Sequence, residues 1–148
     1  TPVDELAIDS ADLAPLTHEM LRMRNVAVRV TARGFSMAPW ILDGDVLTIC
    51  PADASEMRVG DVVFFERPAG TVVAHRILRK LKRDGVTCFA VCGDARAAPC
   101  EVVAPGQVLG KVTAARRGDR VLAISNPAPR LLAIFRAYPR HLVRKLFH

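Results

Sequence analysis

The sequence predicts a mainly β domain, a barrel or a sandwich, with a helix at each end. Short apolar runs follow one another between about residues 26 and 125, and turn-forming residues separate them. No helical spacing of apolar residues intervenes between these runs. A chain of 148 residues with 51% hydrophobic content is long enough to bury one core. We therefore expect a single domain over residues 1–148.

The first element along the chain is a short helix over residues 12–24. Its apolar residues recur at helical spacing, and Asp12 can cap its first turn. Residues 25–32, NVAVRVTA, then alternate between apolar and polar side chains, with Val26, Val28 and Val30 on one face. Alternation with a period of two indicates a strand with one buried face.

Six further apolar runs complete the expected β core. They lie at residues 45–50, 61–66, 71–80, 86–92, 107–115 and 120–125. Asp84-Gly85 lies between two of these runs and indicates a hairpin, and Arg117-Gly118-Asp119 indicates a second one. This pattern predicts antiparallel strands joined by tight turns.

Helical spacing returns at residues 128–147, an amphipathic segment that Pro139 should kink. Apolar side chains line one side, and Arg136, Arg140 and Arg144 line another. In a chain of net charge +6, this basic face fits a solvated surface, an acidic partner or peripheral contact with an anionic membrane. Nucleic acid fits less well, because few aromatic residues are present for stacking. No run reaches the ~18 apolar residues of a membrane span. We expect a soluble chain, cytoplasmic or membrane-peripheral.

The four cysteines are Cys50, Cys88, Cys92 and Cys100. On a strand over residues 86–92, Cys88 and Cys92 share a face about 13 Å apart, too far for a disulfide or a shared metal. Cys92 can approach Cys100 across a loop, but nothing in the pattern demands that bond. Buried free thiols are the favoured interpretation, with no metal and no cofactor.

One serine stands out in the stretch GFSMAPWI, residues 34–41, and a nucleophilic Ser36 needs a base nearby. Of the four histidines, only His75 lies in an expected core strand, with Val73 and Ile77 as same-face neighbours. An imidazole on an apolar face tends to stay neutral, which suits a general base, although a lone histidine there is more often structural. Asp94 follows the next strand and is either an ordinary turn aspartate or the residue that orients His75.

Four segments resemble, in order and spacing, the sequence boxes of type I signal peptidases. They are GFSMAPWILDGDVLTI at 34–49, MRVGDVVFFERPAGTVVAHRIL at 57–78, VCGDARAAP at 91–99 and VAPGQVLGKV at 103–112. The resemblance covers about residues 30–113. Most bacterial members, like the related LexA-like repressors, have a lysine at the position of His75. The Ala-His-Arg sequence here is instead similar to the archaeal and endoplasmic-reticulum enzymes, which use Ser, His and Asp.

The resemblance implies a serine endopeptidase that cleaves leader or signal segments from polypeptides by acyl transfer. Ser36 would be the nucleophile, His75 the general base and Asp94 its orienting partner. Gly34, Phe35 and Met37 flank Ser36, and with it they would form the oxyanion and substrate-binding segment. The implied fold is mainly β, the antiparallel barrel-like catalytic fold of signal peptidases and LexA-like proteins, and the family favours small substrate residues just before the cut.

Two positions depart from the family pattern. Phe35 stands where signal peptidases usually have glycine, and Gly34 stands where many have a serine that assists the oxyanion. Oxyanion stabilisation would then rest mainly on backbone N–H groups, and loss of one donor costs about 3–4 kcal/mol in other hydrolases. The alternative function is therefore a catalytically weak or inactive peptidase-like binding or regulatory module. A LexA-like regulator fits less well, because about 30 residues before the first box are too few for a helix-turn-helix domain and linker.

Overall fold

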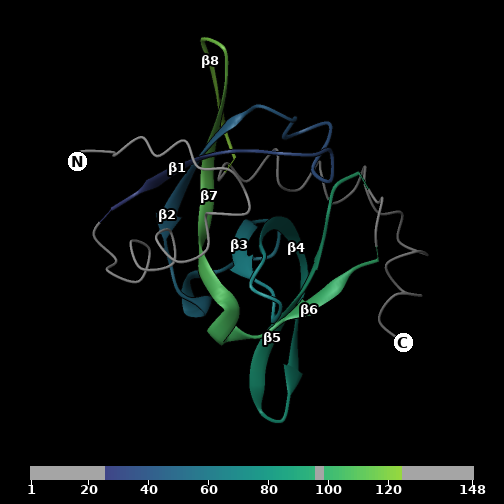
Figure 1. Cartoon of the computed structure of the whole chain (residues 1–148). Helices are drawn as coiled ribbons and strands as arrows, with labels where there is room; N and C mark the ends of the chain where they lie inside the picture. Colours follow the sequence, from purple (N-terminus) through teal and green to yellow (C-terminus); the bar gives the residue numbers. More distant parts are fainter. Residues whose placement is uncertain (1–25, 96–98, 125–148) are drawn as a thin grey trace.

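The computed structural model describes residues 26–95 and 99–124, and these form one antiparallel sheet of eight strands (Figure 1). Its order is β1-β2-β7-β3-β4-β5-β6, with β8 paired to β7. Two short 3-10 helices, η1 (Ala54–Glu56) and η2 (Pro105–Gln107), interrupt the strands. The strands are β1 (Val28–Thr31), β2 (Val46–Pro51), β3 (Val62–Glu66), β4 (Val72–Arg83), β5 (Val86–Cys92), β6 (Glu101–Val103), β7 (Val108–Arg117) and β8 (Arg120–Ala123).

The mainly β prediction is confirmed, but the sheet is not closed into a barrel. β1 and β6 stand at its two ends and do not pair with each other. The two expected helices, 12–24 and 128–147, lie outside the described residues, and so does the basic face expected to meet a membrane. Among the described residues, no helix is long and apolar enough to cross a membrane.

β3 lies in the middle of the sheet, between β4 and β7, and is buried on both faces. Val62 and Phe64 pack in one apolar cluster with β1, β2 and β7. Val63 and Phe65 pack in a second cluster with residues of β4, β5 and β6. Burial of both faces explains why β3 is an unbroken apolar run, whereas β1, with one buried face, alternates.

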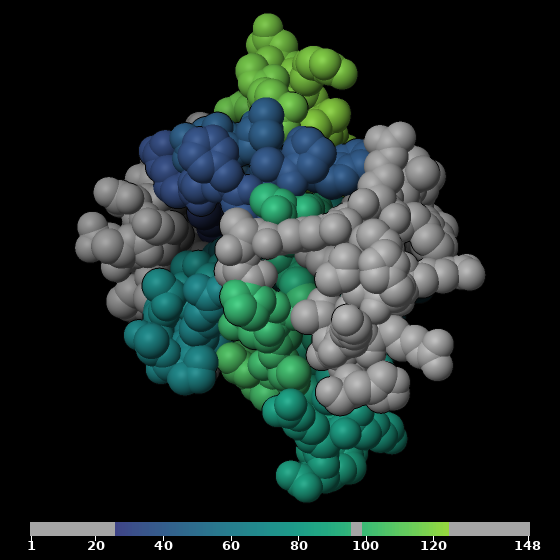
Figure 2. Space-filling view, turned by 90° about the vertical axis from the view of Figure 1, so that its right-hand side faces the viewer, coloured from purple at the N-terminus to yellow at the C-terminus, as the bar shows by residue number. Residues whose placement is uncertain are grey.

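Two tight hairpins project from opposite ends of the molecule, as the two views agree (Figure 1, Figure 2). The β4–β5 hairpin turns at Asp84 and Gly85, whose φ angles of 51° and 78° are those a two-residue turn requires. The β7–β8 hairpin turns at Gly118 and Asp119. Both hairpins were expected from the sequence.

Three Gly-Asp sequences place a buried aspartate against a cation from another part of the sheet. The pairs are Asp45 with Arg117, Asp61 with Lys111, and Asp94 with Arg76. Asp45 and Asp61 also accept the backbone N–H of the residue three positions earlier. The hydrogen bond from Arg117 lowers the pKa of Asp45. Because a buried carboxylate is stable only when paired, these sequences fix where β2 and β3 begin and where β5 ends.

Cys92, the last residue of β5, forms a disulfide with Cys100, directly before β6. Cys50 and Cys88 are free thiols. The favoured interpretation of buried free thiols is therefore wrong for Cys92 and Cys100 and confirmed for Cys88. Cys50 is free as expected but only half-buried. Strands β5 and β6 are neighbours in the sheet, and this adjacency brings the two cysteines together.

We expect non-reducing digestion and mass spectrometry to recover a peptide linked through Cys92 and Cys100. A loop of this length contributes about 2–3 kcal/mol to the free energy of unfolding in the chain-entropy model. The double variant Cys92→Ser/Cys100→Ser should lose about that amount in chemical denaturation, whereas the control Cys50→Ser should lose less. A linked peptide containing Cys88 instead would contradict the observed pairing.

Candidate active site

Ser36 lies exposed in the turn that follows β1. Asp43 accepts the backbone N–H of Gly34 at 2.8 Å, and the amide of Ile41 donates to the carbonyl of Met37 at 2.9 Å. Met37 is buried in the core, whereas Phe35 is 70% exposed. The inward Met37 and the outward Phe35 leave Ser36 at the surface between them.

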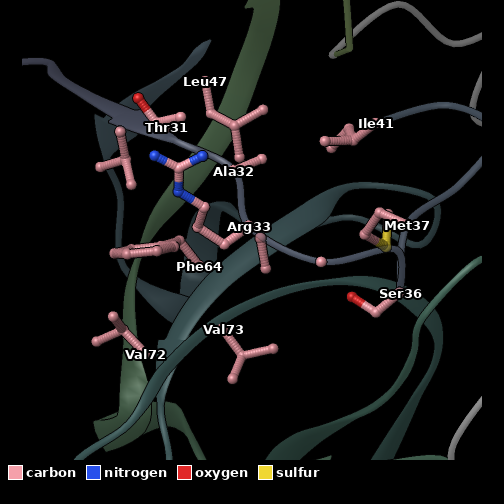
Figure 3. Close-up of a pocket in the computed structure, with 13 residues that line it drawn as sticks. Thr31, Ala32, Arg33, Ser36, Met37, Ile41, Leu47, Phe64, Val72 and Val73 are labelled. Carbon is pink, nitrogen blue, oxygen red and sulfur yellow. The ribbon is translucent and has the colours of Figure 1, made fainter. Parts of the chain in front are cut away.

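A cavity of about 190 Å³ opens beside Ser36 (Figure 3). One wall is formed by β1 and the turn after it, and the other by residues 72–74 of β4. Leu47 and Phe64 also line the cavity, and most of the lining is apolar. The Ser36 hydroxyl is directed towards this space (Figure 3). Gly34 and Met37 also line it, but Phe35 does not.

Two strand segments that line the cavity have an edge without a partner strand among the described residues. β1 pairs only with β2. β4 pairs with β5 only from Arg76 onward, so residues 72–75 pair with β3 alone. Open strand edges of this kind can bind an extended peptide through backbone hydrogen bonds.

His75 is buried on β4, and its Nδ1 atom is wholly enclosed. Its ring centroid lies 6.1 Å from that of Phe65, and Val73 and Ile77 pack in the same apolar cluster as Phe65. Burial lowers the pKa of His75, and the negative charge of Glu101 opposes that shift. The imidazole is therefore neutral near pH 7 and able to accept a proton.

Gly93 is the point at which the segments of Ser36 and His75 meet. A Cβ atom at position 93 would lie 2.5 Å from the carbonyl oxygen of Ser36 and 3.3 Å from Nε2 of His75. The N–H of Ala95 donates to the same carbonyl at 2.9 Å. No hydrogen bond joins the Ser36 hydroxyl to the imidazole in the described chain. Catalytic hydrogen bonds often tighten only when substrate binds.

Asp94 lies beside this junction, but its carboxylate faces Arg76. The guanidinium donates three hydrogen bonds of 2.8–3.2 Å to Asp94 and one of 2.8 Å to the carbonyl of Gly60. Both side chains of the ion pair are buried. Among the described residues, the side-chain hydrogen bonds to the Asp94 carboxylate all come from Arg76. That Asp94 orients His75 therefore stays a prediction.

The acidic group that the structure brings to Nδ1 of His75 is Glu101, whose Oε1 atom lies 3.6 Å away. Arg67 donates three hydrogen bonds of 2.7–3.3 Å to this carboxylate. Sequence reasoning missed Glu101, because β6 is only three residues long and the resemblance pointed to Asp94. The nearest signal in the sequence was the position of Glu101 directly after Cys100.

Comparison with known proteins assigns the chain to no family. No protein-family model matches the chain, and no curated protein matches it. Within residues 26–95 and 99–124, no group of three or more His, Cys, Asp or Glu side chains is arranged to hold a metal ion.

The close approach at Gly93 can be tested with a pair of glycine variants. Gly93→Ala forces a methyl group against the Ser36 carbonyl, so we expect a loss of about 1–3 kcal/mol in the free energy of unfolding, measured by chemical denaturation. Gly106→Ala is the matched control, because a Cβ atom there meets nothing within 4 Å. Equal stability of the two variants would contradict this contact.

The Arg76–Asp94 pair is expected to be essential for stability. Asp94→Ala leaves a buried guanidinium without its counter-charge, which costs about 3–5 kcal/mol. The double variant Arg76→Met/Asp94→Leu removes both charges and should recover much of that loss. Equilibrium denaturation measures both effects, and a loss below about 1 kcal/mol for Asp94→Ala would show that the pair is not structural.

Proposed function

We propose that the chain is a serine endopeptidase of the signal-peptidase type, with Ser36 as nucleophile and His75 as general base. The observation that carries the proposal is that the backbone carbonyl of Ser36 and Nε2 of His75 both lie next to Gly93. Three segments far apart in the sequence converge there, and each belongs to a motif of the resemblance. The open sheet would then be a variant of the signal peptidase and LexA-like catalytic fold.

In the proposed reaction, Nε2 of His75 takes the proton of the Ser36 hydroxyl as Oγ attacks the scissile carbonyl carbon. The peptide C–N bond breaks, and the imidazolium gives its proton to the leaving amine. Water, deprotonated by the same imidazole, then cleaves the acyl-enzyme ester and releases the carboxylate product. The backbone N–H of Ser36 is the proposed oxyanion donor. That of Gly34 is already donated to Asp43.

The proposed substrate is an extended polypeptide that carries a leader segment. Its backbone would pair with the open edges of β1 and β4, and its side chains would enter the apolar cavity beside Ser36. A cavity of about 190 Å³ suits small side chains. Phe35 departs from the family, but its side chain is turned to solvent and leaves the cavity open.

A second candidate is a peptide-binding module without turnover, and it is favoured by the lack of a hydrogen bond between Ser36 and His75 in the described chain. Such a module would use the same cavity and the same open strand edges. It differs from the enzyme only in whether Ser36 becomes acylated. Labelling of Ser36 by a fluorophosphonate probe therefore separates the two.

The peptidase assignment predicts that Ser36→Ala and His75→Ala each lower cleavage of a leader peptide by at least about 1000-fold. Ser55→Ala is the matched control, since this exposed serine lies in η1 and outside the cavity. Because the pKa of His75 is lowered below 6.5, kcat/KM should persist below pH 6.5 and fall as pH drops through that lowered pKa. Full activity of either alanine variant would overturn the assignment.

A further inference from the structure

We propose that Glu101, rather than Asp94, is the carboxylate that positions His75, and that Arg67 holds Glu101 for this role. The kinetic consequence rests on the proposed peptidase function. The positioning itself can be measured on the ring of His75 without turnover.

The buried Nδ1 atom of His75 needs an acceptor or donor. It has no hydrogen-bond partner among the described residues, and an unpaired buried polar atom is destabilising. Oε1 of Glu101 lies 3.6 Å away. A movement of less than about 1 Å would bring the two atoms to hydrogen-bond distance. Glu101 is thus placed to satisfy Nδ1.

Asp94 is committed elsewhere. Its two carboxylate oxygens accept three hydrogen bonds from Arg76, and both residues are buried. The arrangement repeats that of Asp45 with Arg117, where a Gly-Asp sequence likewise pairs with a cation. Turning Asp94 towards His75 would leave the buried guanidinium of Arg76 without its counter-charge, which is strongly destabilising.

Glu101 is fixed by its backbone and by its side chain. It pairs in register with Val91 of β5, and the preceding residue, Cys100, forms the disulfide with Cys92. Arg67 lies in the β3–β4 turn, where its N–H donates to the carbonyl of Thr71 at 2.8 Å. Its guanidinium reaches Glu101 with the bidentate geometry that holds a carboxylate in one orientation.

This arrangement favours the tautomer of His75 that carries its proton on Nδ1, which leaves Nε2 free to act as a base. A proton on Nδ1 that is donated to Glu101 leaves Nε2 unprotonated, and Nε2 is the nitrogen beside Gly93 and Ser36. When Nε2 takes the proton of Ser36, the carboxylate stabilises the imidazolium. The charged groups that act on the ring are Glu101 and Asp94, which raise the pKa of His75, and Arg67, which lowers it.

Imidazole ¹⁵N NMR of the full chain in a Ser36→Ala background tests the positioning. The Nδ1–H tautomer should dominate, and Glu101→Gln should reduce its share and lower the pKa of His75. Asp94→Asn, which keeps hydrogen-bonding oxygen for Arg76, should change the tautomer less. The proposal is overturned if Asp94→Asn shifts the tautomer and Glu101→Gln leaves it unchanged.

Kinetics on the Ser36 enzyme provide the second readout. Glu101→Gln should lower kcat at least about tenfold with little change in KM, because the carboxylate acts on His75 and not on the substrate. Glu56→Gln, an exposed glutamate in η1, is the matched control and should leave kcat unchanged. If the NMR shift is observed but Ser36→Ala retains full cleavage, the positioning stands and the peptidase proposal fails. Unchanged kcat in an active enzyme carrying Glu101→Gln would overturn the catalytic part of the inference.

Discussion

The buried ion pair between Arg76 and Asp94 is the constraint on which the geometry of the candidate site depends. Arg76 belongs to β4, Asp94 to the segment after β5, and the same guanidinium also binds the carbonyl of Gly60 before β3. An unpaired guanidinium in the interior would cost several kcal/mol, so the three segments are held together. The residues next to this pair in the sequence are His75 and Gly93, and both are therefore held at the turn of Ser36.

Structural and chemical roles consequently alternate along the same two segments. On β4, His75 is the proposed general base, and Arg76 forms the buried ion pair. After β5, Gly93 allows the close approach to Ser36, and Asp94 supplies the counter-charge. In the sequence, a residue of the ion pair and a residue of the candidate site stand next to each other in the same motif, so the sequence does not separate their roles. The contacts divide each motif into residues that form the buried ion pair and residues that lie beside the Ser36 backbone.

The sequence was most informative where local chemistry decides the structure. The alternation of residues 25–32 predicted a strand there, and β1 occupies its centre, Val28–Thr31, with alternating burial. Asp84-Gly85 predicted the β4–β5 turn, because a positive φ at both positions requires such residues. β6 was missed because three residues carry no period. The open sheet, with β1 and β6 unpaired to each other, depends on long-range pairing that no local pattern encodes.

The candidate site shows the same division. Ser36 and His75 were chosen by their order within family-like motifs, and the structure brings their segments together at Gly93. Which carboxylate meets Nδ1 of His75 was beyond the sequence, since it depends on the directions of two side chains. The carboxylate of Asp94 pairs with Arg76. Glu101 lies near Nδ1 of His75 because it begins the short strand β6, directly after the disulfide-bonded Cys100.

The environment of His75 combines two opposed electrostatic demands. Burial keeps the ring neutral and able to accept a proton, but it also disfavours the imidazolium that the proposed reaction would form. The carboxylate of Glu101 beside Nδ1 stabilises the imidazolium and so raises the pKa of His75. The guanidinium of Arg67, which binds that carboxylate, lowers the pKa and so helps to keep the ring neutral. Glu101 is partly exposed, so solvent weakens its field at the ring, and its separation of 3.6 Å from Nδ1 weakens it further. A shorter separation between Oε1 of Glu101 and Nδ1 of His75 would strengthen that field.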